Sequence, residues 1–253
     1  MISKNKIKFI RSLEMKKYRD ESGCFLAEGN KLVSDIMPYF DCELMIAKPR
    51  WTATKGDIRA AELIAAEDGD IEKASLLKTP QDVIAVFRKP KQTLDLPELQ
   101  NQLSLVLDGI QDPGNLGTIA RIADWFGVRT LICSTDTADI YNPKTVQATM
   151  GAIARVSVFY TVLPEFLASA GNIPVYGTFL EGKNIYTEQL TPNGLIVMGN
   201  EGKGVSRAVE KLINRRLFIP PWPEGADTGE SLNVAAATAI ACSEFRRRTA
   251  YQV

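Results

Sequence analysis

The sequence predicts an α/β protein with a mainly parallel sheet, preceded by a smaller α/β unit at its amino terminus. Short apolar runs alternate with amphipathic helical patterns from residue 103 onward, which is the order of elements in a helix-covered parallel sheet. A polar, proline-marked stretch stands before this alternation, and further strand-like runs precede that stretch. With 253 residues, 45% of them hydrophobic, the chain can bury a sizeable core.

The amino-terminal unit is expected to span residues 1–90. It begins with a basic helix and continues with strand-like segments at 25–29, 44–47 and 83–87, and residues 91–102 are interpreted as a linker. The basic helix either contacts nucleic-acid phosphates or is simply solvated, and charge alone does not separate these interpretations. The candidate nucleic-acid contacts are Lys4, Lys6, Lys8, Arg11, Lys16, Lys17 and Arg19.

The carboxy-terminal unit, residues 103–253, contains six apolar runs that are expected to form strands. They cover residues 103–107, 130–133, 156–159, 174–178, 195–198 and 217–219. The first run passes through a polar, glycine-broken turn into a helix whose apolar face repeats at Ile119, Ile122, Ala123 and Phe126 and stops at Gly127. Arg121 lies about 200° around that helix from Ile119, so we expect it to face the turn.

Two later turns have the same character. The run at 195–198 leads into a loop with three glycines around Glu201, which allows a ligand close to the backbone. The run at 217–219 leads through a polar loop to Ser231, which we expect to be the N-cap of the following helix. A near-match to a phosphate-binding loop at residues 177–184 has Asn184 where magnesium needs a hydroxyl, so a nucleotide site is not expected there.

Composition excludes several kinds of chemistry. Lys plus Arg and Asp plus Glu both total 30, so a nucleic acid must be met by a local patch. The absence of histidine excludes a Ser-His-Asp triad and histidine metal ligands. The four cysteines form no CxxC pair, so we expect reduced, mostly buried thiols and no metal. No long apolar run or signal-peptide pattern is visible, so a cytoplasmic protein with no membrane partner is expected.

Three segments together resemble the motifs of the SpoU (TrmH) family of RNA ribose methyltransferases, in the SPOUT superfamily. The first covers residues 112–121, the second 197–206, and the third combines 219–220 with 231–235. The resemblance extends over about residues 103–247. Residues 25–29 and 79–86 are more faintly similar to the amino-terminal substrate-binding domain of the rRNA-modifying branch.

The resemblance implies a carboxy-terminal trefoil-knot (SPOUT) domain, a smaller domain similar to ribosomal protein L30, and a homodimer. It also implies S-adenosylmethionine as cofactor, held by loops at the carboxyl ends of the strands. The cofactor-binding positions by family pattern are Gly177, Thr178, Gly199, Asn200, Gly202, Ile219, Pro221, Ser231, Leu232 and Asn233. The catalytic positions by the same pattern are Arg121, Asn115, Glu201, Ser231 and Asn233.

The expected activity is therefore 2'-O-methylation of structured RNA, with rRNA favoured by the amino-terminal domain. Transfer from a sulfonium needs no metal and no histidine; it needs the acceptor hydroxyl held in line and its proton removed. Arg121 acts either as the base or as an electrostatic clamp, and its permanent charge favours the clamp. The alternatives are a tRNA methyltransferase, or a non-catalytic RNA-binding or ribosome-assembly protein that kept the fold.

Overall fold

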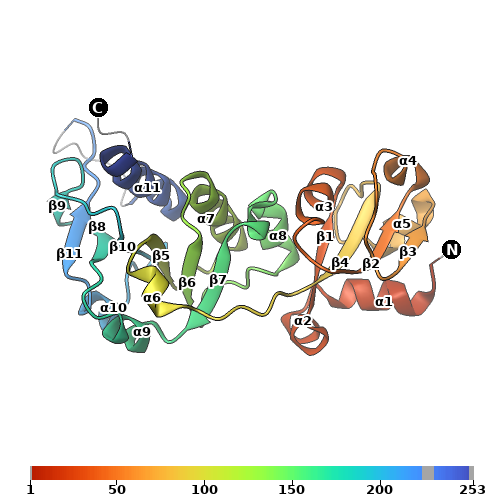
Figure 1. Ribbon diagram of the computed structural model, residues 1–253, viewed down its shortest axis with the longest axis horizontal. Coiled ribbons are helices and arrows are strands. Elements are labelled where there is room, and N and C mark those ends of the chain that lie inside the picture. The colour runs from red at the N-terminus through yellow and green to blue at the C-terminus, as the bar shows by residue number, and fades with distance from the viewer. Residues whose placement is uncertain (1, 224–230, 251–253) are drawn as a thin grey trace. The chain divides into compact units, whose positions relative to one another are not determined.

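The computed structural model describes residues 2–223 and 231–250 (Figure 1). By the density of its internal contacts the chain forms two units. The amino-terminal unit consists of Met1–Lys91 together with Asp139–Ala154, and the second unit consists of Gln92–Ala138 together with Arg155–Val253. We call the second unit the methyltransferase-like unit because it contains the three segments that resemble ribose-methyltransferase motifs. Within the described ranges, no helix has the length and apolarity needed to cross a bilayer.

The amino-terminal unit is built on a four-stranded sheet in the order β1-β4-β2-β3. The strands are β1 (Cys24–Glu28), β4 (Val83–Arg88), β2 (Cys42–Ala47) and β3 (Leu63–Ala65). Its helices are α1 (Lys4–Ser12), α2 (Lys16–Ser22), α3 (Asn30–Ile36), α4 (Pro49–Thr52), α5 (Asp68–Ala74), α8 (Pro143–Thr149) and the 3-10 turn η1 (Ala152–Ala154). The expected basic helix is therefore two helices, because the chain turns at Leu13–Met15.

Successive residues of β1 point to opposite faces of this sheet, as a strand requires. Leu26 packs with Ile10 and Leu13 in a core on one face. Phe25 stacks with Phe40 and Phe87 on the other. All residues of β1 are buried, so the strand is covered on both sides.

The methyltransferase-like unit has a seven-stranded, all-parallel sheet in the order β7-β6-β5-β10-β8-β11-β9. Its strands are β5 (Leu103–Asp108), β6 (Thr130–Ser134), β7 (Ser157–Thr161), β8 (Val175–Phe179), β9 (Lys183–Asn184), β10 (Gly194–Gly199) and β11 (Arg215–Phe218). The predicted α/β class and the six predicted strands are confirmed, with ends shifted by one or two residues. The two-residue β9 was not expected, and no helix follows residues 177–184 directly.

Helices cover both faces of this sheet, and Figure 1 shows α7 (Pro113–Trp125) and α11 (Val234–Ala250) side by side on one of them. The short helices α6 (Leu96–Leu99), α9 (Leu163–Ser169) and α10 (Arg207–Glu210) contribute to the core on the other. Leu99 is buried in that core beside Val106. The stretch expected to be a linker therefore packs on the sheet from Leu94 onward.

Helix α7 begins and ends where its sequence dictates. Asp112 is the N-cap, accepting a hydrogen bond from the Asn115 amide at 2.7 Å, and Pro113 occupies the first turn, where no amide is needed. The chain leaves the helix through Gly127 with φ +65°, which a glycine adopts without strain. The polar turn before α7 is thereby held at the carboxyl end of β5.

Candidate active site

Loops from three neighbouring strands are joined at the carboxyl edge of the large sheet. The Asp108 carboxylate, at the end of β5, accepts a hydrogen bond from the Ser206 amide at 2.7 Å. Asn200, after β10, donates to the Gly109 carbonyl at 2.7 Å, and the Gly109 amide donates to Ser134 of β6 at 2.8 Å. Since ligands of open α/β sheets bind outside this edge, the loops form a rigid frame where a site is expected.

A continuous hydrogen-bond chain links the three predicted motifs in this frame. Asn115 donates from Nδ2 to Glu201 Oε1 at 2.9 Å and accepts at Oδ1 from Asn233 Nδ2 at 3.1 Å. These residues come from α7, the β10 loop and the segment before α11. The structure therefore brings together three predicted catalytic residues that lie 86 and 118 positions apart.

Asn233 also begins α11. Its Oδ1 accepts from the Ala235 amide at 2.9 Å and from the Ala236 amide at 3.3 Å. The prediction that Ser231 is the N-cap is wrong, because the helix begins at Val234 and asparagine caps as well as serine does. Ser231 lies exposed two residues earlier, so its proposed roles in catalysis and cofactor binding rest on the motif alone.

Arg121 is exposed in the third turn of α7. Among the residues that the structure describes, no hydrogen bond or ion pair reaches its guanidinium. Its five N–H donors are therefore available to a substrate phosphate or a developing alkoxide. The hydrogen-bonded chain of Asn115 does not extend to it.

Asn200 shapes the glycine-rich loop from within. Its Oδ1 accepts from the amides of Gly202 and Lys203, both at 3.0 Å, and its own backbone pairs with Gly204. A Cβ at Gly199 would lie 2.3 Å from the Val205 nitrogen, so only glycine fits there. The backbone amide, the carbonyl and the Oδ1 of Asn200 are hydrogen-bonded inside the loop, so Asn200 helps to hold the loop. Its contact with the cofactor stays a prediction.

The other predicted cofactor positions lie within β8, after β11 and before α11. Gly177 is in β8, where a Cβ would lie 2.5 Å from Ile213 Cδ1 and 2.7 Å from Phe179 Cε2. A side chain at this position would therefore require the ends of the Ile213 and Phe179 side chains to move. Ile219 and Pro221 follow β11 and are partly exposed, and Leu232 is exposed before α11. These apolar side chains beside open loop backbone suit a neutral adenosine group.

The four cysteines belong to the interiors of the two units. All four cysteines are free and buried, and burial raises the pKa of Cys42 to about 11 and of Cys242 to about 12. The thiols therefore stay protonated near neutral pH, and the prediction of reduced, mostly buried thiols is confirmed. In the described part of the chain, no group of three or more His, Cys, Asp or Glu side chains is placed to hold a metal ion.

Most of the predicted RNA-binding cations of the amino terminus are exposed, and Arg19 is buried. Lys4, Lys8, Lys16 and Lys17 are exposed, and Arg11 is exposed although its guanidinium also contacts the carbonyls of Lys73 and Ser75. Lys6 forms an ion pair with Glu62.

Arg19 does not fit the prediction that the basic residues of the amino terminus contact RNA. It is buried to 1% exposure, and its guanidinium binds Asp139 and two carbonyl groups. The prediction that Arg19 contacts RNA is therefore wrong, because a buried guanidinium bound by protein oxygens cannot reach a phosphate.

Sequence reasoning missed the residues that hold the frame, above all Asp108 and Ser134. A usable signal existed, because each is the polar residue that ends a buried apolar strand. In a parallel sheet such residues gather at one edge.

A parallel α/β sheet with a polar constellation at its carboxyl edge defines an enzyme-like ligand-binding unit, here attached to a separate small α/β unit. Residues 102–243 match the model of the SpoU rRNA methylase family, and residues 4–85 match the MRM3-like substrate binding domain. The chain belongs to the SpoU rRNA methylase family, as its three motifs predicted.

Individual relatives cover nearly the whole chain. It is 30% identical over 246 residues to the 23S rRNA (guanosine(2553)-2'-O)-methyltransferase RlmP of Bacillus subtilis, covering 95% of this chain and 96% of that protein. A TrmH-family protein from Porphyromonas gingivalis has a similar structure, with a TM-score of 0.90, 41% identity, and coverage of 98% and 100%. The AdoMet-bound rRNA methyltransferase of Sinorhizobium meliloti superimposes with a TM-score of 0.81, 29% identity, and coverage of 98% and 97%.

Proposed function

We propose that this protein transfers the methyl group of S-adenosylmethionine to a ribose 2'-hydroxyl of rRNA. The observation that carries the proposal is the Glu201–Asn115–Asn233 chain, which joins the three SpoU motifs at the carboxyl edge of the sheet. The rRNA substrate is inferred from the activities for which RlmP and the Sinorhizobium meliloti protein are named, and from the substrate-binding domain.

The loops after β8, β10 and β11 and the segment before α11 would hold the cofactor. The proposed contacts are Gly177 and Thr178 within β8, the backbone of Gly199 and Gly202, the apolar side chains of Ile219, Pro221 and Leu232, and the polar groups of Ser231 and Asn233. Apolar walls and small residues suit adenosine, and solved relatives bind AdoMet. The cofactor supplies an activated methyl on a sulfonium, so the protein has to orient the acceptor and manage one proton.

Arg121 is proposed to clamp the substrate phosphate and to stabilise the negative charge that develops on the 2'-oxygen. A guanidinium stays protonated at working pH, and electrostatic preorganisation is what it does well. Its lack of any partner in the described structure supports this role. Asn115 and Glu201 orient the substrate through their shared hydrogen bond, and Glu201 also offers a carboxylate that could receive the proton.

Three further features belong to the proposal. Strand β10 follows β8 and β9 in sequence yet lies between β5 and β8, and this re-entry into the sheet supports a trefoil knot. Exposed apolar side chains on the methyltransferase-like unit, notably Trp125 at 85%, support a homodimer. The bacterial 23S rRNA substrate for which the relative RlmP is named supports a cytoplasmic location.

The division of labour is also proposed. Residues 1–90 would choose the RNA through Lys4, Lys6, Lys8, Arg11, Lys16 and Lys17, residues 91–102 would connect, and residues 103–253 would bind cofactor and dimerise. The concentration of all three motifs after residue 103 supports this division.

The test is calorimetry with S-adenosylmethionine, with and without a chelator, followed by transfer of labelled methyl to rRNA and tRNA. We expect binding and transfer that survive the chelator, with the label on a ribose 2'-oxygen of rRNA. Label on tRNA would identify a tRNA methyltransferase. RNA binding without cofactor binding or transfer would identify a non-catalytic assembly protein.

A further inference from the structure

Residues 139–154 lie in sequence between two strands of the large sheet, yet they pack in the amino-terminal unit. Helix α8, which this segment contains, contacts β1. The chain therefore passes between the two units at three places: Lys91 to Gln92, Ala138 to Asp139, and Ala154 to Arg155. A domain joined to the rest of the protein by a single linker would need only the first of these crossings.

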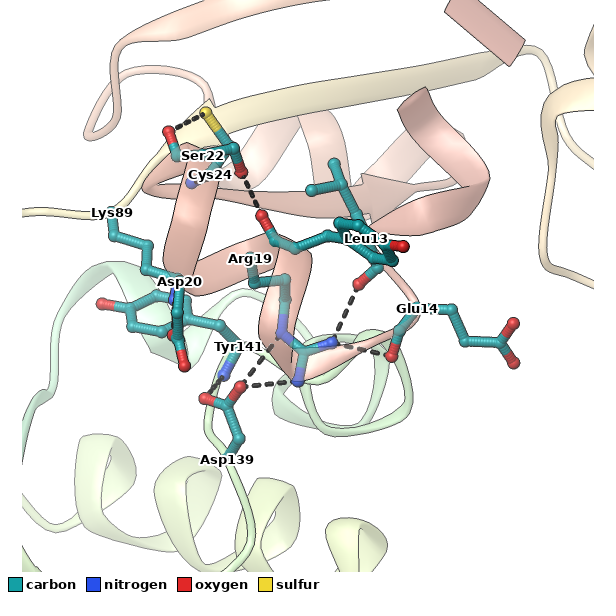
Figure 2. A network of polar contacts seen from close by, with 10 residues as sticks. Leu13, Glu14, Arg19, Asp20, Ser22, Cys24, Lys89, Asp139 and Tyr141 are labelled. Carbon is teal, nitrogen blue, oxygen red and sulfur yellow. Dashed lines mark hydrogen bonds and ion pairs between the residues drawn. The ribbon is translucent and has the colours of Figure 1, made fainter. Parts of the chain in front are cut away.

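Arg19 and Asp139 fasten the start of this segment to α2. Asp139 Oδ2 accepts from Arg19 Nη2 at 2.6 Å and from Nε at 3.0 Å, as Figure 2 shows. The remaining guanidinium nitrogen, Nη1, donates to the carbonyls of Leu13 and Glu14, both at 2.8 Å. Arg19 is 1% exposed and Asp139 12%, so the pair is largely shielded from water.

Tyr141 extends this contact. Its backbone amide donates to Asp139 Oδ1 at 2.9 Å, and its ring lies 5.0 Å from that of Phe25 in β1. Lys89, just before the first crossing, lies with its Nζ 5.5 Å from the Tyr141 ring centroid and 2.7 Å from Asp20 of α2. Two of the three crossings thus begin within one cluster of contacts (Figure 2).

This cluster is poorly suited to partial opening. If residues 139–141 moved away from α2, the largely shielded Arg19 guanidinium would lose its carboxylate partner, which is disfavoured until water can reach it. In the same step the Phe25 ring would separate from the Tyr141 ring. The segment is therefore either docked or released, with little between.

We propose that Arg19 and Asp139 are positioning residues for methyl transfer. By holding residues 139–154 on the substrate-binding unit, they tie RNA bound by that unit to the methyltransferase-like sheet through three chain connections. The proposal rests on the proposed function, and it assigns the segment a task that none of the motif residues performs.

The decisive variant is Asp139→Asn in the full-length protein. Asparagine keeps the size of the side chain and an oxygen for the Tyr141 amide, but it removes the charge that Arg19 needs. We expect unchanged affinity for S-adenosylmethionine and for an rRNA fragment, faster hydrogen exchange in residues 139–154, and kcat lower by about a hundredfold, the scale on which small misplacements of reacting groups act. Arg19→Lys should rescue part of the loss that Arg19→Ala causes.

Glu21→Gln is the matched control, because Glu21 forms an exposed ion pair with Lys17 on the same helix. It should leave all four measurements unchanged. If Asp139→Asn fails to fold, Asp20→Asn replaces it as the test variant, because Asp20 is more than half exposed and its loss is less disruptive. Neutralising Asp20 weakens its contact with Lys89, so hydrogen exchange should again rise and kcat should again fall.

Normal kcat with fast exchange in residues 139–154 would overturn the proposal, and so would weakened RNA binding with unchanged kcat. Absence of methyl transfer by the unmodified protein would instead contradict the proposed function. The exchange measurement still reports docking of the segment in that case.

Discussion

Arg19 and Arg121 carry the same charge but differ in burial and in hydrogen bonding. Arg19, in α2, is buried and makes four hydrogen bonds inside the protein. Arg121, in α7, is exposed and has no partner among the described residues. The sequence marks both as RNA-contacting or catalytic cations, but only Arg121 is exposed. A buried arginine bound by protein acceptors holds the structure together, whereas an exposed arginine without partners is available to a substrate.

The largest effect separating the two arginines should be on stability. Arg19→Ala removes one partner of a buried ion pair and should lower the free energy of unfolding by about 3–5 kcal/mol. Arg121→Ala removes an exposed side chain and should change it by less than about 0.5 kcal/mol. Urea denaturation of both variants measures this difference, and equal losses would contradict the comparison.

For Arg121 we expect a loss of catalysis without a loss of stability. Arg121→Ala should keep cofactor affinity while the rate of methyl transfer falls by at least about a hundredfold, the scale for losing one preorganised charge. Arg121→Lys should recover little, because an ammonium does not reproduce the planar fork. Near-normal single-turnover rates in the alanine variant would show that Arg121 is not catalytic.

Glu201 allows a finer test of the site. Glu201→Gln keeps an oxygen that can accept from Asn115, whereas Glu201→Ala leaves the amide unheld. If Glu201 only orients Asn115, glutamine should retain most of the rate and alanine should lose about tenfold, equal to one hydrogen bond of about 1.4 kcal/mol. Equal, larger losses in both variants, with an altered pH–rate profile, would identify Glu201 as the proton acceptor.

The exposed lysines should contribute to RNA binding, which the buried Arg19 cannot do. Replacing Lys4, Lys8 and Lys16 together by alanine should weaken RNA binding. The salt dependence of binding should become shallower by about one unit of slope for each phosphate that a lysine no longer neutralises. Cofactor binding is the internal control. An unchanged slope would mean that the RNA is bound by other parts of the protein.

The smallest effect concerns acid stability of the amino-terminal unit. Hydrogen bonding by the Arg50 guanidinium lowers the pKa of Asp82 to about 2, with further help from Asn30 and Lys48. Because the folded-state pKa is depressed, the stabilisation is present above the ordinary pKa near 4 and is lost as pH falls toward 2. Asp82→Asn should make the free energy of unfolding depend less on pH in this window. An unchanged pH dependence would contradict stabilisation by the ion pairs of Asp82.

Much of the methyltransferase-like unit follows from sequence because its rules are local. Apolar runs give the strands, Asp112 and Pro113 start α7, and the carboxyl ends of parallel strands share an edge, so Asn115, Glu201 and Asn233 could be expected to meet. The exact partners needed coordinates. Whether Ser231 or Asn233 caps α11 depends on where the chain enters the helix, and local propensity favours both equally.

The amino-terminal unit was harder to predict because its decisive contacts are distant in sequence. Nothing near Arg19 indicates that Asp139, 120 positions later, neutralises it. A basic cluster on a short helix looks the same whether one member points inward or all point outward. For the same reason, the packing of residues 139–154 with this unit could not be seen in an alternation of strands and helices.

The central claim is ribose methylation of rRNA by a site that depends on Arg121. It is tested most directly by mapping 2'-O-methyl groups across all rRNA and tRNA in cells that lack this gene and in cells complemented with the wild-type or Arg121→Ala protein. The account predicts that an rRNA ribose methyl disappears with the gene, returns with the wild type and stays absent with Arg121→Ala. Identical ribose methylation in all strains, or full restoration by Arg121→Ala, would contradict it.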